Sequence, residues 1–375
     1  MEKLIAIYRT VYLLPSEAFI PSQLSGLRHY IPVIWYRDAT TTNPASLTGF
    51  NAVCLIGATS FWKKVVFTLF GLAKLAQIPQ LVHAHFGPDA AMILPFVKRN
   101  KLPLVVTYHG FDAQQSRGAM LCSRKLSNIL FLFREKGLIR YASRIIVVSE
   151  FLKNCLINKG YPADKLLVHY IGVDTEKFVP GINAKVAYRL INISRHVNWK
   201  GVDTILRALP ALIVKYPGLH LIQIGSGSET ETLKRLADEL GVSNHIEWLG
   251  ALSHDKVLAE LGKASLYIHA SRQDSKGQTE AFGIALIEAQ ACGLPVVATR
   301  SGGIPEAIIE NETGLLFEEN DYMSLAFQVD ELFSNPDDLV LKAKKARQFV
   351  VNKFDIINCS AKLENIYDEI LTKSD

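Results

Sequence analysis

Short apolar runs alternate with longer stretches of helical period along most of the chain. Each run has three to six residues, and the stretches between them repeat their apolar residues every three or four positions. This alternation is typical of parallel β-sheets covered by helices. We therefore expect the α/β fold class. The predicted strands are Leu4–Tyr8, Val33–Tyr36, Ala52–Ile56, Leu81–His85, Leu104–Tyr108, Arg144–Val148, Leu166–His169, Tyr188–Ile193, Leu219–Ile224, Ile246–Trp248, Leu266–His269, Pro295–Ala298 and Gly314–Phe317.

The chain has 375 residues, enough for two domains at roughly 150 residues each. A turn-rich segment, 175–186, separates two complete sets of strands and helices. The segment Asp337–Leu371 has helical period and an apolar face, so we expect one helical segment that packs on both domains. The predicted domain limits are 1–178, 179–345 and 346–375. Predicted helices are Trp62–Ala76, Arg124–Arg140, Gly201–Leu212, Glu229–Leu240, Asp255–Gly262, Gly283–Ala291 and Ile304–Ile309.

The composition excludes several classes of protein. An apolar fraction of 49% with 21% charged residues is incompatible with wholesale disorder. We expect no transmembrane helix, because no run approaches about 18 apolar residues, and the first residues resemble a strand more than a signal peptide. The five cysteines are scattered without a CxxC pair, which argues against a zinc cluster and a disulfide framework. A cytoplasmic location is the expectation.

The charge is unevenly distributed. Residues 1–180 carry 21 Lys and Arg against 10 Asp and Glu, a net of +11, whereas residues 181–375 carry 20 against 26, a net of −6. A basic half favours an anionic partner, such as a phosphorylated acceptor, an anionic membrane or nucleic acid. A solvated basic face without a partner is the alternative. Nucleic acid is not expected, because the chain lacks helix-turn-helix, RRM and zinc signatures.

The stretch 278–300 carries two carboxylates in an E-x7-E pattern. Glu280 falls in a predicted loop, and Glu288 falls in the early turns of the following helix. Eight helical residues span about 12 Å, which suits gripping two ends of one elongated ligand. The residues Phe282, Gly283 and Ile284 lie at the helix start, where free amides favour phosphate. Two surface glutamates on an ordinary helix are the alternative.

Two loops that follow predicted strands also suit an anion. Arg195 and Lys200 follow the strand that ends at Ile193, a placement that suits clamping a diphosphate. Gly225 and Gly227 form half of a dinucleotide fingerprint, whose third glycine is replaced by Thr230. We read a tight turn that offers amides to a phosphate or nucleoside. Exposed loop cations and a plain strand-to-helix turn are the alternatives.

Histidines end two predicted strands of the first half. His109 and Asp112 follow one strand, and His83 and His85 form an HxH pair on another. The pair places both imidazoles on one face, as a metal site requires. Because no third ligand lies nearby in the sequence, we favour a buried, hydrogen-bonded histidine. Ser16 and Glu17 follow the first strand, where they would cap a helix or line a cleft.

Taken together, these motifs resemble the retaining glycosyltransferases of family 4, which have the GT-B fold. The resemblance is strongest from Tyr141 to Leu316, in LINISRHVNWKGVDTIL and EAFGIALIEAQACGLPVVATRSGGIPEAI. The first half, with LPSEAFI, HAHFGPDAA and VVTYHGFDA, resembles the subgroup that builds bacterial exopolysaccharide and lipopolysaccharide. The resemblance implies two Rossmann-like domains that face each other across a cleft, with a C-terminal helix that packs back on the first domain.

The resemblance also implies roles for individual residues. Arg195 and Lys200 would hold the diphosphate, Glu280 would bind the donor sugar, and Glu288 would bind the ribose. The turn Trp248–Leu249–Gly250 would meet the base, and His109 would lie beside the transferred sugar. The implied catalytic residues are His109, Glu280, Arg195 and Lys200. The implied donor-binding residues are Arg195, Lys200, Gly225, Gly227, Trp248, Leu249, Gly250, Glu280, Phe282, Gly283, Ile284 and Glu288. Those on the acceptor side are Ser16, Glu17, His85 and Asp112.

One departure from the family pattern concerns the first domain. Many relatives have a glycine-rich loop after the first strand, whereas Arg9–Pro15 contains no glycine. The acceptor side is therefore expected to be built differently here.

The implied activity is transfer of a hexose from a UDP-sugar such as UDP-glucose to a saccharide acceptor, with retention of configuration. The acceptor would be linked to a lipid diphosphate, in exopolysaccharide synthesis. No metal and no other cofactor is expected, because no DxD motif stands beside the donor elements.

The stretches Trp62–Phe70 and Arg124–Arg144 mix cations with large apolar side chains, so we expect peripheral contact with an anionic membrane. Packing of their apolar faces on the core is the alternative.

Three alternatives stay open at this stage. A GDP-mannose-dependent transferase would use the same clamp with a different base. A sucrose-phosphate-type synthase would use a soluble acceptor. Outside the enzymes, the chain would be a non-catalytic protein that binds a sugar nucleotide or nucleic acid.

Overall fold

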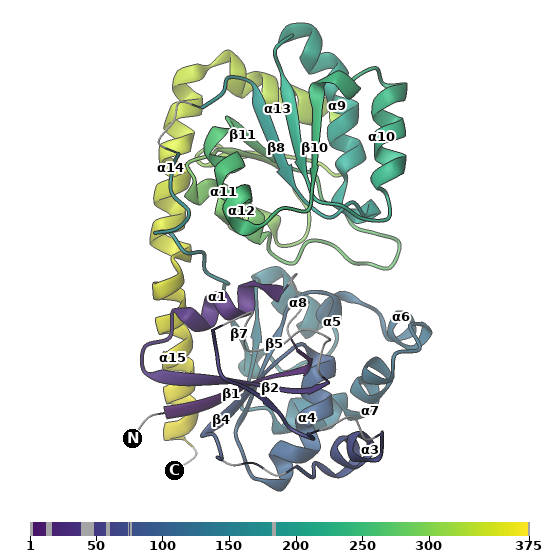
Figure 1. The fold of residues 1–375 in the computed structure, drawn as a ribbon, viewed down its shortest axis with the longest axis vertical. Coiled ribbons are helices and arrows are strands. Elements are labelled where there is room, and N and C mark those ends of the chain that lie inside the picture. Colours follow the sequence, from purple (N-terminus) through teal and green to yellow (C-terminus); the bar gives the residue numbers. More distant parts are fainter. Residues whose placement is uncertain are drawn as a thin grey trace. The chain divides into compact units, whose positions relative to one another are not determined.

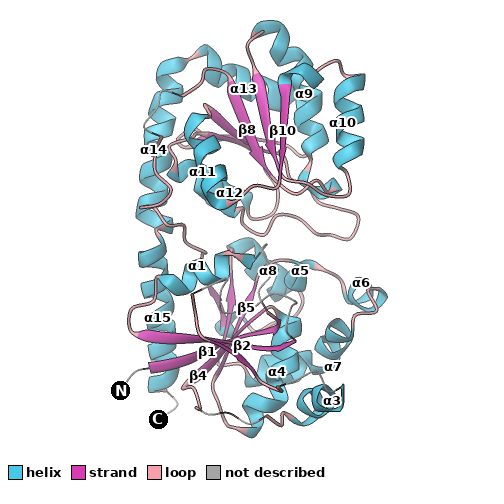
Figure 2. Ribbon diagram, viewed as in Figure 1, coloured by secondary structure: helices cyan, strands magenta, loops and turns pink. Residues whose placement is uncertain are grey.

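The computed structural model describes residues 3–12, 17–38, 49–57, 61–73, 75, 77–181 and 185–373. It contains two parallel β-sheets, each flanked by helices (Figures 1 and 2). The chain divides into two compact units, residues 1–172 with 356–375 (unit 1) and residues 173–355 (unit 2). The α/β class and the parallel sheets agree with the prediction.

Unit 1 is built on a seven-stranded sheet of order β3-β2-β1-β4-β5-β6-β7. Its order reverses between β1 and β4. The strands β4 and β5 are buried throughout, which explains why they read as continuous apolar runs. The elements are β1 (Lys3–Val11), α1 (Phe19–Ser25), β2 (Tyr30–Asp38), β3 (Ala52–Cys54), α3 (Phe61–Phe70), β4 (Leu81–His85), α4 (Gly87–Arg99), β5 (Leu104–Tyr108), α5 (Phe111–Gln114), α6 (Arg117–Cys122), α7 (Leu126–Tyr141), β6 (Arg144–Val147), α8 (Glu150–Asn158), β7 (Leu166–Val168) and α15 (Ile356–Thr372).

Unit 2 is built on a six-stranded sheet of order β10-β9-β8-β11-β12-β13, which reverses between β8 and β11. Its elements are β8 (Arg189–Ile193), a 3₁₀ turn (Asn198–Lys200), α9 (Val202–Lys215), β9 (His220–Ile224), α10 (Thr230–Glu239), β10 (Ile246–Gly250), α11 (His254–Lys263), β11 (Leu266–His269), α12 (Ile284–Ala291), β12 (Val296–Thr299), a 3₁₀ turn (Ile304–Ala307), β13 (Gly314–Phe317), α13 (Tyr322–Ser334) and α14 (Pro336–Phe354).

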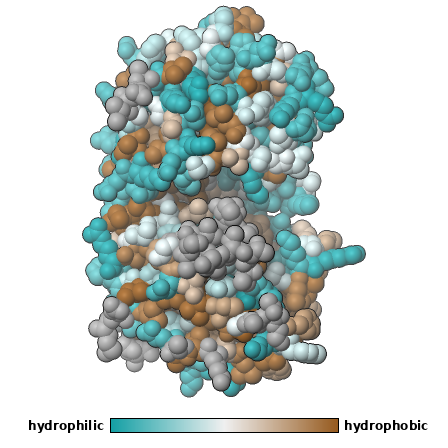
Figure 3. All heavy atoms as spheres, viewed as in Figure 1, coloured by the Kyte–Doolittle hydropathy of each residue, from teal (hydrophilic) through white to brown (hydrophobic). Residues whose placement is uncertain are grey.

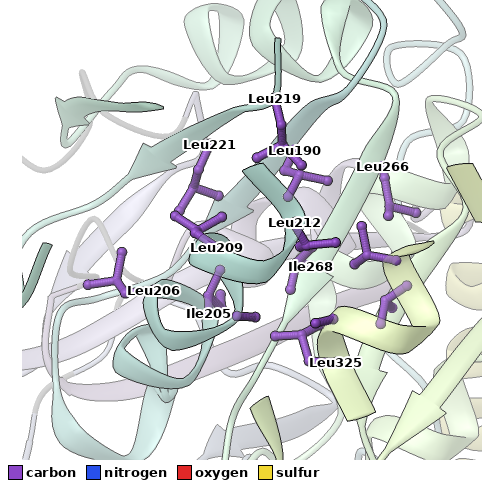
Figure 4. Close-up of a cluster of buried hydrophobic side chains, with 14 of the residues drawn as sticks. Leu190, Ile205, Leu206, Leu209, Leu212, Leu219, Leu221, Leu266, Ile268 and Leu325 are labelled. Carbon is purple, nitrogen blue, oxygen red and sulfur yellow. The ribbon is translucent and has the colours of Figure 1, made fainter. Parts of the chain in front are cut away.

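The core of unit 2 lies between its sheet and the helices α9 and α13. Leu206, Leu209 and Leu212 of α9 pack against strand residues such as Leu221, and Leu325 of α13 closes the cluster (Figure 4). These leucines recur on one face of α9, as the helical period predicted. The packing fixes the end of β8 and the start of α9, between which Arg195 and Lys200 lie.

The C-terminal segment differs from the single predicted helical segment. It forms two helices, α14 in unit 2 and α15 in unit 1. Asp355 has an extended ψ of 134° and pairs as an isolated bridge with Val173, and its carboxylate accepts a 2.5 Å hydrogen bond from Thr175. These contacts interrupt the helix. The predicted limit at residue 345 falls inside the continuous α14, whereas the two units divide after residue 355.

The helix α15 packs on unit 1, as the resemblance implied. Its Leu363 and Tyr367 join the core that contains Ile5 of β1, and the Tyr367 hydroxyl lies 2.6 Å from Nδ1 of His83. Figure 1 shows α15, in yellow, beside the purple strand β1.

The helix predicted over Trp62–Ala76 ends earlier, at Phe70. Gly71 takes a left-handed φ of 65°, and a Cβ atom there would lie 2.3 Å from the amide nitrogen of Phe96. This close approach to α4 stops α3. The segment Ile304–Ile309 also differs, since it forms a 3₁₀ turn over Ile304–Ala307.

Candidate active site

Two oppositely charged side chains meet where the order of the second sheet reverses. The carboxyl ends of strands at such a reversal are where open α/β sheets bind ligands. Lys200 ends the 3₁₀ turn after β8, and Glu280 lies in the loop between β11 and α12. The ammonium of Lys200 donates to Oε2 of Glu280, and the two side chains are 13% and 14% exposed. The sequence placed both residues in this site.

Glu280 has two further partners. Nε2 of His269 lies 3.1 Å and Oγ of Ser271 lies 3.3 Å from the same Oε2 atom. Burial alone would raise the pKa of Glu280, but the charge of Lys200 and the hydrogen bond from His269 hold it far below its usual range. Burial lowers the pKa of His269, so its imidazole is neutral. Glu280 is therefore a fixed carboxylate.

Arg195 and Lys200 share one aromatic neighbour. Cζ of Arg195 lies 5.8 Å, and Nζ of Lys200 lies 4.4 Å, from the centroid of the Trp199 ring. Arg195 is exposed, and within the described residues its guanidinium makes no hydrogen bond or ion pair. Its charge is therefore available to an anion at the end of β8.

The glycine loop after β9 packs on the loop that carries Arg195. The amide of His196 donates to the carbonyl of Ser226 over 3.1 Å. Gly225 has a φ of 132°, and a Cβ atom there would lie 1.9 Å from the carbonyl oxygen of Ser194, so the position requires glycine. A Cβ atom at Gly227 would lie 2.3 Å from the carbonyl oxygen of His196. The structure thus brings the two predicted loops together.

The predicted base-side turn lies next to this loop. The amide of Gly225 donates to the carbonyl of Gly250 over 2.8 Å. Trp248 packs edge-on against His196, with ring centroids 5.5 Å apart, and Leu249 is partly exposed between Trp248 and Gly250. The residues predicted to contact diphosphate and base therefore form one group in unit 2.

The second predicted carboxylate lies in α12. This helix begins at Ile284, and Gly283 caps it with a left-handed φ of 97°. The buried Phe282 anchors the helix start against Phe354 of α14, with centroids 5.3 Å apart. Within the described residues, the Glu288 carboxylate makes no hydrogen bond or ion pair, and burial raises its pKa to about 7. Glu288 is thus a carboxylate without a partner among the described residues, in the second turn of α12.

Buried charges also gather at the β1/β4 reversal of unit 1. Arg9 pairs with Glu17 and Asp89, and all three side chains are about one-tenth exposed. The Cζ atom of Arg9 also lies 4.3 Å from the centroid of the Phe86 ring. The segment that lacks the family's glycines therefore contributes a buried cation, whose two carboxylate partners lie outside that segment.

Three imidazoles stack beside this cluster. His83 and His85 have ring centroids 4.5 Å apart, His85 and His109 have centroids 5.1 Å apart, and Nδ1 of His85 lies 2.8 Å from Nε2 of His109. Burial and the neighbouring positive groups lower the pKa of each, so the stack is neutral. His109 packs between Phe19 and Phe86. His83 is buried and hydrogen-bonded at both nitrogens, as predicted for one member of the HxH pair.

The other residues predicted for the acceptor side have structural partners. The buried carboxylate of Asp112 accepts hydrogen bonds from the amides of Gly87, His109 and Gly110, at 3.0 to 3.2 Å. It thereby joins the loops after β4 and β5, which is a structural role. Glu17 is engaged by Arg9. Ser16 lies outside the described residues.

Sequence reasoning missed four residues of these clusters. His269 and Ser271 surround Glu280, Trp199 lies between the two cations, and Arg9 pairs with two carboxylates. Each stands at or just beyond the carboxyl end of a predicted strand, the same signal that identified Lys200.

Among the described residues, no group of three His, Cys, Asp or Glu side chains lies close enough together to hold a metal ion.

Solved structures share this architecture over nearly the whole chain. HepE (Alr3699) from Anabaena, solved in complexes with UDP and with UDP-glucose, matches 98% of this chain and all or nearly all of its own, with TM-scores of 0.78 and 0.77 at 18% identity. Sucrose-phosphate synthase from Thermosynechococcus elongatus matches 99% of this chain and 100% of its own, with a TM-score of 0.78 at 18% identity. These likenesses, with the two Rossmann-like units, define the fold as GT-B.

The sequence also matches two family models that together span most of the chain. Residues 174–352 match "Glycosyl transferases group 1", and residues 29–177 match "Glycosyltransferase Family 4". The chain is therefore a glycosyltransferase-family-4-like protein with the GT-B fold.

Curated relatives carry several different names. A GDP-mannose-dependent alpha-(1-6)-phosphatidylinositol monomannoside mannosyltransferase of Mycobacterium tuberculosis is 32% identical over 230 residues, which cover 58% of this chain and 60% of that protein. The putative colanic acid biosynthesis glycosyltransferase WcaL of Salmonella typhimurium is 28% identical, over 78% of this chain and 75% of its own. The match thus spans about 60% of the mycobacterial relative.

Proposed function

We propose that this protein transfers a hexose from a nucleotide diphosphate sugar to a saccharide acceptor. The proposal rests chiefly on the group at the β8/β11 reversal, where Arg195 and Lys200 lie over one indole ring and Lys200 pairs with the carboxylate of Glu280. Two cations suit a diphosphate, and the carboxylates of Glu280 and Glu288 suit the hydroxyls of a sugar and a ribose. The family 4 and group 1 models support the same activity.

In this proposal the two cations supply the electrostatic catalysis. Arg195 and Lys200 stabilise the negative charge that grows on the leaving diphosphate, helped by the amides at the start of α12. The chain therefore needs no metal for this step. Glu280 binds the hydroxyls of the donor sugar.

We also propose that the product retains the anomeric configuration of the donor. The carboxylate best placed at the strand ends, Glu280, is tied to Lys200, His269 and Ser271, which disfavours it as a nucleophile. The acceptor hydroxyl then attacks on the face that the diphosphate leaves, and a phosphate oxygen takes its proton. The bond from the anomeric carbon to phosphate breaks as the bond to the acceptor oxygen forms.

The first candidate donor is a UDP-hexose such as UDP-glucose. The complexes of HepE with UDP and with UDP-glucose support this choice. GDP-mannose is a second candidate, because the 32%-identical mycobacterial relative is named as GDP-mannose-dependent. The acceptor proposed is a lipid-diphosphate-linked saccharide in exopolysaccharide synthesis, in keeping with the name of WcaL.

We further propose that unit 1 contacts an anionic membrane from the cytoplasmic side, through α3. This helix buries Phe67 and Thr68 but leaves Phe61, Trp62 and Phe70 61% to 72% exposed. Core packing therefore does not account for these three aromatic residues. None of the described helices is both long and apolar enough to cross a bilayer.

The neighbouring helix α7 adds a further apolar side chain to the exposed aromatic surface of α3. Arg134 of α7 donates to the carbonyl oxygens of Ala91 and Thr68, which ties α7 to α4 and α3. The neighbouring Phe133 is 83% exposed. Figure 3 shows brown side chains in the part of unit 1 where α3 and α7 lie. Aromatic side chains with nearby lysines are suited to the interface of an anionic bilayer.

Vesicle flotation tests the membrane contact. The full chain should float with vesicles of phosphatidylglycerol and phosphatidylethanolamine, and much less with phosphatidylcholine alone. The double substitution Trp62→Ser and Phe70→Ser should abolish flotation, whereas Val214→Ser, at an 85% exposed site of unit 2, should not. Equal flotation with neutral vesicles, or none with either, rejects the membrane proposal.

A transfer assay tests the proposed activity. The protein is incubated in EDTA with ¹³C-labelled UDP-glucose, UDP-galactose or GDP-mannose and a set of octyl glycosides, and the anomeric carbon is followed by NMR. We expect one donor to be consumed, with an α-linked product from an α-configured donor. A β-linked product rejects retention, and an absolute requirement for added metal rejects the metal-free step. If no donor is consumed, either by transfer or by hydrolysis, the proposed activity is rejected.

A further inference from the structure

Trp199 contacts both cations of the proposed diphosphate clamp. It lies in the 3₁₀ turn between β8 and α9, where Lys200 is its neighbour and Arg195 precedes it by four residues. The Lys200 ammonium is 4.4 Å, and the Arg195 guanidinium carbon 5.8 Å, from the centroid of its ring. Both distances lie within the roughly 6 Å over which an indole attracts a cation.

The backbone of this turn is held rigidly. The amide of Arg272 donates to the carbonyl of Trp199 over 2.8 Å, and the amide of Lys200 donates to the carbonyl of Val197 over 2.9 Å. Gly201 has a left-handed φ of 63°, and a Cβ atom there would lie 1.9 Å from the carbonyl oxygen of Ala270. The turn is thus pressed against the end of β11, so the backbone that carries the indole, the platform for the two cations, is fixed.

The two cations depend on this platform to different degrees. Lys200 also pairs with Glu280, so a second group fixes its position. Among the described residues, the indole is the only group in contact with the Arg195 guanidinium that the structure records. A free arginine side chain loses rotational freedom when it binds a ligand, and that loss weakens binding. The indole restricts Arg195 before the ligand arrives.

We infer that Trp199 is a positioning residue, which holds Arg195 and Lys200 over one ring so that both reach the same diphosphate. The inference rests on the proposed function, because it assumes that the two cations bind a diphosphate. A neutral ring is suited to this task because it attracts both cations. A carboxylate in its place would compete with the diphosphate for them. The indole itself need not touch the substrate.

Titration of UDP and of GDP in EDTA, by calorimetry, tests this inference. Trp199→Leu should weaken binding of the better-bound nucleotide by about 5- to 30-fold, which corresponds to the loss of two cation–π contacts. Trp199→Phe and Trp199→Tyr, which keep a ring, should bind within about threefold of wild type. Phe327→Leu removes a 65% exposed aromatic ring elsewhere in unit 2 and should leave the affinity unchanged.

A double-substitution cycle separates positioning from a merely structural role. In the Arg195→Ala background, adding Trp199→Leu should weaken binding by a smaller factor than it does in wild type, because one of the two positioned cations is gone. Trp199→Met serves as the second non-aromatic variant if Trp199→Leu does not fold. Unchanged affinity in the Leu or Met variant, strictly additive effects with Arg195→Ala, or loss of affinity in the Phe and Tyr variants overturns the inference. If wild type binds neither UDP nor GDP, the proposed function fails and the inference fails with it.

Discussion

Lys200 and Glu280, eighty residues apart in the sequence, form a largely buried ion pair where β8 and β11 lie side by side. The pair joins the proposed phosphate-binding cation to the proposed sugar-binding carboxylate. A donor diphosphate would therefore compete with Glu280 for Lys200, and the carboxylate would gain freedom to accept from sugar hydroxyls. In the proposed function, recognition of the two parts of the donor would be coupled through this contact.

Removal of the Lys200 charge should slow sugar transfer strongly. The ammonium is proposed to stabilise charge on the leaving diphosphate, and loss of a preorganised donor of this kind costs about 2.7 to 4 kcal/mol, or 10²- to 10³-fold in rate. We expect that decrease in kcat for Lys200→Ala in the NMR transfer assay. Lys234→Ala, at an exposed site on α10, is the matched control. A Lys200→Ala rate equal to wild type contradicts the assignment.

The buried pair should also be visible in the pH dependence of stability. The pKa of Glu280 is held below its unfolded value, so its contribution is present above the unfolded pKa of about 4.3 and is lost as the pH falls through the folded pKa. Glu280→Gln should therefore lose less stability than wild type between pH 5 and pH 2, measured by urea unfolding. Parallel pH profiles of the two proteins would show that the pair does not stabilise the fold.

Glu288 should show the opposite dependence. Burial raises its pKa to about 7, so the folded protein disfavours the charged form, and this penalty grows as the pH rises from the unfolded pKa of about 4.3 through 7. We expect Glu288→Gln to stabilise the protein at pH 8, by on the order of 2 kcal/mol, and to have little effect at pH 4. Urea unfolding at both values measures this difference, and a destabilised variant at pH 8 would contradict the buried environment.

The same group should make nucleotide binding depend on pH. The proposed ribose contact requires the carboxylate, which accepts two hydroxyl hydrogen bonds. Affinity for the better-bound of UDP-glucose and GDP-mannose, whose diphosphates have no proton that titrates in this range, should therefore rise between pH 6 and pH 8. Glu288→Gln should bind more weakly at pH 8 and show no such rise. Calorimetric titration at three pH values provides the test; an identical pH profile in the variant would remove Glu288 from the binding site.

Arg9 should be essential for the stability of unit 1. It is the partner of two buried carboxylates, Glu17 and Asp89, and removal of one member of a buried ionic group costs about 3 to 5 kcal/mol. Arg9→Met should lower the free energy of unfolding by that amount. The triple substitution with Glu17→Gln and Asp89→Asn should recover part of it, because no unpaired charge is then left. If the single variant is as stable as wild type, the cluster does not support the fold.

The secondary structure could be predicted from the sequence because parallel strands that are buried on both faces leave continuous apolar runs. All thirteen predicted strands are present, and β4, β5, β11 and β13 have the predicted bounds. Helix breaks and helix ends that depend on contacts with distant parts of the chain could not be predicted. The break at Asp355 requires the bridge to Val173, and the end of α3 at Phe70 requires contact between Gly71 and α4.

The candidate site could be predicted in part for the same reason. Polar residues that follow predicted strands identified Arg195, Lys200 and Glu280, and the structure brings them to one sheet reversal. The partners of these residues were not accessible, since the order of strands in the sheet does not follow the order in the sequence. That order places Lys200 beside Glu280 and, in unit 1, Arg9 beside Asp89, each pair being eighty residues apart in the sequence.

The most direct test of the account is a thermal-shift comparison of wild type and Lys200→Ala with UDP, GDP, ADP and their sugar conjugates, all in EDTA. A ligand at about 100 times its dissociation constant should stabilise wild type by about 2.7 kcal/mol. We predict that UDP or GDP and its hexose conjugate raise the melting temperature of wild type, and that the variant shows little or no rise. Absence of any rise in wild type, or an equal rise in the variant, would contradict a nucleotide-sugar site at Lys200 and Glu280.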